Sequence, residues 1–134
     1  DAGYQALTAF DYSADAVARA RLLYGERDIE LICADACNLP HHNAAFDAVL
    51  DKGTLDAIGI TGGEVLVAAA TELARVVRPS GVVVSVGRVL EPFELERAFP
   101  VGVWEQLRDG GLYLTEDGEA TTDLSASLYA WRRL

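Results

Sequence analysis

The 134-residue sequence has few cations, only two cysteines and no long apolar run. Its 21 acidic residues outnumber 11 lysine and arginine residues, and the net charge of −10 argues against binding to a nucleic-acid backbone. No apolar run approaches the roughly 20 residues of a membrane-spanning helix. We therefore expect neither nucleic acid nor membrane as a partner. A protein substrate, including a basic one, is compatible with this charge.

The cysteines and histidines of the sequence do not have the spacing that is usual for metal sites and paired cysteines. Cys33 and Cys37 do not form a CxxC pair, so we interpret them as reduced thiols of an intracellular protein, cytoplasmic or, as the alternative, mitochondrial. His41 and His42 are adjacent in a polar loop, with no further ligand at a typical spacing. We expect no metal site.

Apolar runs alternate with helical patterns over the first two thirds of the chain. Ser13 is a good helix N-cap, and Gly25 marks the end of the helix that follows. Strand, helix and loop in this order predict an α/β fold with parallel strands and right-handed crossovers. The expected strands are 6–10, 29–33, 46–50 and 82–86, and a second amphipathic helix is expected over 63–77.

The last third has a different pattern. Residues 93–98 and 103–107 resemble short helices, and 112–115 and 124–132 resemble two strands joined by a polar, glycine-containing connection. We expect this second pair to form an antiparallel hairpin at one edge of the sheet. The length and the absence of a linker predict a single domain over residues 1–134.

Three of the expected strands end in, or just before, an aspartate. Asp11, Asp35 and Asp51 should therefore meet where the carboxyl ends of parallel strands open on a crevice, which is where α/β sheets bind ligands. A single aspartate at such a position is more often a helix cap or a turn residue than a ligand-binding group. For Asp51 by itself, we slightly favour the interpretation that it caps the next helix. The three together favour a nucleoside-like ligand. The absence of a P-loop lysine argues against a triphosphate.

Three strings extend this pattern to a known family. The segments CADACNLP (33–40), FDAVLDKGTLDA (46–57) and ARVVRPSG (74–81) resemble class I S-adenosylmethionine-dependent methyltransferases. The string DKGTLDA is more specific, and resembles the seven-strand lysine methyltransferases that act on elongation factor 1-alpha or citrate synthase. The resemblance covers roughly residues 3–88. It implies a Rossmann-like, mostly parallel methyltransferase sheet with an antiparallel C-terminal hairpin, and S-adenosylmethionine as cofactor.

The resemblance also assigns the adenosine half of the cofactor site. Asp11 matches the acidic position that holds the ribose hydroxyls, and Tyr12 is placed to pack on the adenine ring. Asp35 and Ala36 match the position that reads the adenine edge. These four residues are therefore expected to bind the cofactor.

The other half of the site matches the turn after residue 50. Asp51, Lys52, Gly53 and Thr54 match the motif that faces the methionine half and the incoming nucleophile. We expect Asp51 to be catalytic by orienting the acceptor amine, and Lys52 to pair with a cofactor carboxylate unless it is simply solvated. The implied reaction is methyl transfer to a lysine of a protein substrate. A small-molecule methyltransferase and a non-catalytic methyltransferase-like partner subunit are the alternatives.

One part of the family pattern is not found. The family's first strand and its glycine-rich loop, which wraps the methionine part of the cofactor, precede the position of Asp1. We therefore expect residues 1–134 to be an N-terminally truncated methyltransferase domain that does not bind the cofactor by itself.

Overall fold

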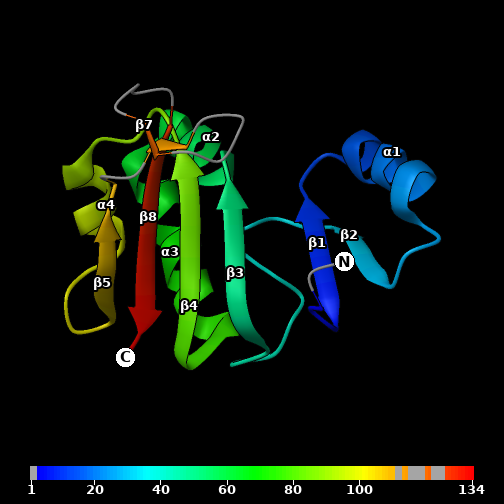
Figure 1. Ribbon diagram of the computed structural model, residues 1–134, viewed down its shortest axis with the longest axis horizontal. Helices are drawn as coiled ribbons and strands as arrows, with labels where there is room; N and C mark the ends of the chain where they lie inside the picture. Colours follow the sequence, from blue (N-terminus) through cyan, green and yellow to red (C-terminus); the bar gives the residue numbers. More distant parts are fainter. Residues whose placement is uncertain (1–2, 111–112, 115–119, 122–125) are drawn as a thin grey trace. The chain divides into compact units, whose positions relative to one another are not determined.

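A computed structural model describes residues 3–110, 113–114, 120–121 and 126–134 (Figure 1). The chain forms two compact units, Asp1–Pro40 and His41–Leu134, and each is described by itself. Both units contain helices and strands, in agreement with the predicted α/β fold. Within the described residues, no helix is long and apolar enough to cross a membrane.

The first unit is a strand–helix–strand motif. Strand β1 (Leu7–Asp11) and strand β2 (Ile29–Cys33) pair in parallel, and helix α1 (Ala14–Tyr24) connects them. The Ser13 hydroxyl accepts a hydrogen bond from the Ala16 N–H, so the predicted N-cap is confirmed. The side chain of Val17 is buried, whereas that of Leu23 is exposed.

The second unit contains a four-stranded mixed sheet, and helices connect some of its strands (Figure 1). Its strand order is β3-β4-β8-β5, with β3 (Phe46–Lys52) parallel to β4 (Val77–Gly87). Strand β8 (Ser127–Arg133) lies between β4 and β5 (Trp104–Asp109) and is antiparallel to both. The helices are α2 (Thr54–Thr61), α3 (Gly63–Val76) and α4 (Pro92–Ala98). Strands β6 (Tyr113–Leu114) and β7 (Ala120–Thr121) form a separate antiparallel pair.

Helix α3 supplies much of the core of this unit. The side chains on the apolar face of this predicted amphipathic helix are buried: Leu66, Ala69, Ala70, Leu73 and Val76. Burial of a leucine side chain of this kind contributes about 1.5–3 kcal/mol. A second cluster is aromatic, with the rings of Phe99 and Trp131 stacked at 4.0 Å between centroids and Trp104 edge-on to Phe99. Together these side chains hold the sheet against its helices.

Strand β3 is at the edge of the four-stranded sheet. It pairs with β4, and no other strand among the described residues pairs with it. The side chain of Leu50, in the middle of its apolar run, is 76% exposed. The apolar run 46–50, which predicted a strand, therefore lies at an edge of the sheet in this unit.

Two predictions for the last third are wrong. Residues 103–107 are not helical, because Trp104–Asp109 is strand β5, paired with β8 from Trp104↔Arg133 onwards. The segment 124–132 does not form a hairpin with 112–115: its described part lies in β8, between β4 and β5. The alternating burial of Tyr129 and Trp131 explains this placement, since one face of β8 is needed to complete the aromatic cluster. Residues 112 and 115 are outside the described residues.

Candidate functional site

Asp11 lies at the carboxyl end of β1, next to the end of β2. Its backbone carbonyl accepts a hydrogen bond of 3.0 Å from the Ala34 N–H, which ties the two strand ends together. Its Oδ1 accepts one of 2.8 Å from the Ser13 N–H, directly before α1. Oδ2 has no hydrogen-bond partner in the part of the chain that the structure describes, and the residue is exposed. An open, oriented carboxylate oxygen of this kind suits the hydroxyls of a ribose.

Tyr12, Asp35 and Ala36 are at the same end of this two-stranded sheet. The Tyr12 side chain is 83% exposed, so its ring is available to a ligand. Asp35 uses Oδ1 to accept a 2.8 Å hydrogen bond from the Cys37 N–H, and its carbonyl accepts one from Asn38. The Asp35 carboxylate therefore shapes the turn. The Ala36 N–H has no acceptor among the described residues, so it is available to donate a hydrogen bond to an adenine edge.

Asp51 is at the carboxyl end of β3 and is only 8% exposed. Its Oδ1 accepts hydrogen bonds from the N–H groups of Thr54, at 2.9 Å, and Leu55, at 3.3 Å. Its Oδ2 accepts a hydrogen bond of 2.6 Å from the Ser85 hydroxyl on β4. The carboxylate thus caps α2, whose N-cap residue Gly53 has no side chain to do so. Its catalytic role stays a prediction.

Lys52 and Gly53 form the turn between Asp51 and α2. Side chains alternate along a strand, so Lys52 faces away from buried Asp51 and is exposed. Gly53 has a φ of 79°, in the left-handed region, and a Cβ at this position would meet no atom within 4 Å. Its N–H donates to the Val86 carbonyl at 3.0 Å. The turn is therefore fixed to the end of β4 while its outer side is open.

Sequence reasoning missed Asp56, Ser85 and Gly87. Asp56 accepts hydrogen bonds from the N–H groups of Arg88, at 2.6 Å, and Leu90, at 3.3 Å, and so fixes the segment after β4 to α2. A Cβ on Gly87 would lie 2.7 Å from Asp56 Oδ1, so any larger residue here would displace the Asp56 carboxylate. Asp56 could have been found because it is part of the DKGTLDA string, and Ser85 because it is the one polar residue in a run of valines.

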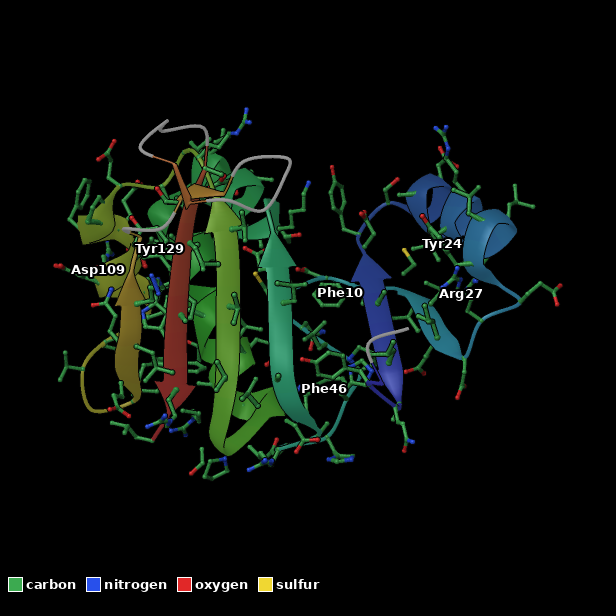
Figure 2. All side chains as sticks on the ribbon, viewed as in Figure 1. Phe10, Tyr24, Arg27, Phe46, Asp109 and Tyr129 are labelled. Atoms are coloured by element: carbon green, nitrogen blue, oxygen red, sulfur yellow. The ribbon has the colours of Figure 1, made fainter. Side chains whose placement is uncertain are left out.

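A small cavity lies beside these groups, at the end of β4. Its volume is about 20 Å³, which is enough for one water molecule. Figure 2 labels Tyr129 of the cavity wall and Asp109, its partner across β5 and β8. The lining residues are Asp56, Ser85, Gly87, Leu90, Leu95, Ser127 and Tyr129. Polar side chains thus meet at this strand end, and no group of three potential metal ligands occurs among the described residues.

The site residues fall into two sets, one in each unit. The structure brings Asp11, Tyr12 and Ala36 together at the end of β1 and β2, where a carboxylate, an aromatic ring and a backbone donor are available to a ligand. It brings Asp51, Lys52 and Gly53 together at the end of β3 and β4. The assignment of the two sets to the nucleoside and amino-acid halves of S-adenosylmethionine stays a prediction.

Comparisons with known proteins give the family. The sequence pattern described as "Methyltransferase domain" matches residues 1–85. A SAM-dependent methyltransferase from Methanosarcina mazei is similar in structure, with a TM-score of 0.76 and 13% identity over 96% of this chain and 82% of that one. No relative is found among curated proteins.

Two further structures show the range of proteins with this fold. The N-methyltransferase NodS from Bradyrhizobium japonicum, in complex with S-adenosyl-L-homocysteine, has a TM-score of 0.73 and 14% identity over 96% of this chain and 66% of that one. The cyclase SpnF has a TM-score of 0.66 and 23% identity over 78% of this chain and 44% of that one. At these identities the likeness establishes the α/β methyltransferase fold. Because the family pattern covers more than half of the chain, this protein belongs to the methyltransferase-domain family and is an enzyme whose cofactor is S-adenosylmethionine.

Proposed function

We propose that this protein methylates a lysine side chain of a protein substrate. The observation that supports this acceptor is the string Asp51 to Ala57, which resembles the motif of the protein lysine methyltransferases. In the structure the string forms the end of β3, a left-handed turn at Gly53 and the start of α2, all fixed by the buried Asp51 carboxylate. A rigid turn at a strand end is suited to positioning an incoming nucleophile.

The cofactor supplies a methyl group on a positively charged sulfur, and transfer to a lysine nitrogen breaks the carbon–sulfur bond with its electron pair left on sulfur. The protein therefore has to position two partners and accept a neutral amine. A free lysine is mostly protonated at pH 7, so the site must desolvate the amine or transfer its proton to water or to a carboxylate. No nucleophile from the chain itself is needed.

Each predicted site residue has one role in this reaction. Asp11 holds the ribose hydroxyls through its open oxygen, Tyr12 packs on the adenine, and the Ala36 N–H, beside Asp35, reads the adenine edge. On the acceptor side, Asp51 orients the amine. It does so from a carboxylate already held by Ser85 and by the first turn of α2, which fixes its position before the substrate arrives.

A labelling experiment tests this proposal. The full-length protein is incubated with S-adenosylmethionine carrying a labelled methyl group and with a cell extract, and labelled proteins are separated and hydrolysed. We expect label in methyl-lysine, and loss of this label with Asp51→Asn. Label only in small molecules would contradict the protein substrate, and label in another amino acid would contradict lysine as acceptor.

A further inference from the structure

The small cavity at the end of β4 has four polar side chains in its wall. They are those of Asp56, Ser85, Ser127 and Tyr129. A buried water needs about two to four polar partners and a cavity of at least about 10–15 Å³. This cavity has a volume of about 20 Å³, so both its size and its lining suit one water molecule.

The pairing of the strands connects this cavity to Asp51. Ser85 is opposite Asp51 of β3 on one side and opposite Tyr129 of β8, labelled in Figure 2, on the other. Residues that are directly opposite project from the same face of a sheet, so the three side chains form one polar row across β3, β4 and β8. All three are buried. Ser85 is therefore the residue that both contacts the Asp51 carboxylate and lines the cavity.

A second carboxylate, that of Asp56, reaches the cavity from α2. Gly87 is two residues beyond Ser85 and so is on the same face of β4. A Cβ on Gly87 would lie 2.7 and 2.9 Å from the two carboxylate oxygens of Asp56, so the absence of a side chain here makes room for them. Asp56 is half-buried, whereas Asp51 is buried. Asp56 is therefore the carboxylate of the two that is more accessible to solvent.

The hydrogen bonds of Asp51 leave one direction in which a proton can move on through side chains. Its Oδ1 accepts from the backbone N–H groups of Thr54 and Leu55, which cannot take up a proton. Its Oδ2 is 2.6 Å from the Ser85 hydroxyl, a distance typical of a charge-assisted bond. A hydroxyl oxygen accepts as well as donates, so Ser85 can donate to Asp51 and accept from a water in the cavity.

We propose that this cavity binds one water, which links the Ser85 hydroxyl to the Asp56 carboxylate and completes a proton path from Asp51 to solvent. The path rests on the function proposed above, in which the acceptor lysine loses a proton before its nitrogen attacks the methyl group. Asp51 takes this proton from the ammonium, and Ser85 takes it from Asp51 and passes its own hydroxyl proton to the water. The water passes one proton to Asp56, which releases it to solvent. Every group of the path then has its first protonation state, and the acceptor amine is neutral.

Two substitutions of Ser127 test the water site and leave the bond between Asp51 and Ser85 in place. Ser127→Val adds methyl groups that fill the cavity and exclude the water, whereas Ser127→Ala removes the same hydroxyl and leaves the space. Crystal structures of the full-length protein and of both variants locate the water. We expect density for one water within hydrogen-bond distance of Ser85 and Asp56 in the wild type and in Ser127→Ala, and none in Ser127→Val. A wild-type cavity without this density overturns the proposal.

The proton path is tested by the pH dependence of turnover. At pH 7, Ser127→Val should lower the turnover number about tenfold or more, as for a lost proton transfer, while Ser127→Ala stays near the wild type. The KM for S-adenosylmethionine should be the same in all three proteins. The deficit of Ser127→Val should shrink towards about pH 10, near the ordinary pKa of lysine, because the acceptor then arrives neutral. A deficit of the same size at every pH would be structural and would overturn the path.

These two measurements distinguish a failure of the path from a failure of the proposed function. If methyl-lysine is formed and Ser127→Val turns over like the wild type at pH 7, the path is wrong and the lysine methyltransferase function stands. If no methyl-lysine is formed, the proposed function is wrong and the path from a lysine fails with it. The crystallographic density needs no acceptor, so it decides the water site in either case.

Discussion

The Ser85 hydroxyl donates a 2.6 Å hydrogen bond to Asp51 Oδ2, and both side chains are more than nine-tenths buried. This pair joins the ends of two parallel strands, and the other carboxylate oxygen of Asp51 caps α2. A single carboxylate therefore fixes two strand ends and a helix start. Its position does not depend on a bound ligand.

Ser85→Ala should destabilise the protein by about 1–3 kcal/mol, because a buried carboxylate oxygen loses its donor. Urea unfolding measures the change. Thr71→Ala is the control, since Thr71 is exposed on α3 and donates only to a carbonyl one turn earlier, and its effect should stay within about 0.5 kcal/mol. Equal effects of the two substitutions would mean that the Asp51 carboxylate does not depend on Ser85.

In the full-length protein, Asp51→Asn should lower the turnover number much more than it weakens cofactor binding. The amide keeps an oxygen for the N–H groups of Thr54 and Leu55 and removes the negative charge that we place beside the acceptor amine. Steady-state kinetics and calorimetry with S-adenosylhomocysteine separate the two effects. Equal losses in both would make Asp51 a cofactor ligand only.

In the full-length protein, Asp11→Ala should weaken cofactor binding by about 1.5–3 kcal/mol, the value of a hydrogen bond to a charged group. Calorimetry with S-adenosylhomocysteine measures this loss. Asp15→Ala is the matched control, because Asp15 is an exposed aspartate in the first turn of the adjacent helix. An unchanged affinity for Asp11→Ala would refute its assignment to the ribose.

Gly87→Ala should destabilise the segment after β4, because the added Cβ would lie 2.7 and 2.9 Å from the two carboxylate oxygens of Asp56. Displacement of Asp56 would release the N–H groups of Arg88 and Leu90, at a cost of about 1–3 kcal/mol. Gly63→Ala is the control, since its Cβ would meet only Arg97 at 3.7 Å. If both alanines had the same effect on urea unfolding, the Asp56–Gly87 contact would not be required.

Local signals were sufficient to predict the first half of the fold. The Ser13 cap and the β1, β2 and α3 segments follow from short-range hydrogen bonding and from apolar periodicity, and the structure has them close to the predicted bounds. Strand β5 could not be found in this way. Trp104 and Leu107 have helical spacing, and only the pairing of this segment with β8, far along the chain, makes it a strand.

The candidate site shows the same limit. The aspartates at strand ends could be selected because each directly follows an apolar run. The residues that contact these aspartates could not be predicted, because they belong to other elements of the fold. Ser85 on β4 contacts Asp51 on β3, and Gly87 on β4 contacts Asp56 on α2. The assignments of Asp11, Tyr12, Asp35, Ala36, Asp51, Lys52 and Gly53 to the cofactor stay predictions.

The edge position of β3 has a consequence for handling the protein. An apolar strand with one unpaired side presents a row of backbone N–H and C=O groups that another chain can join. The exposed Leu50 side chain would be buried by such an addition, and between Phe46 and Leu50 the only charged residue is Asp47, which is already paired with Arg78. A preparation of residues 41–134 alone should therefore form larger particles as its concentration rises, and an Ala48→Lys substitution on this strand should keep it monomeric.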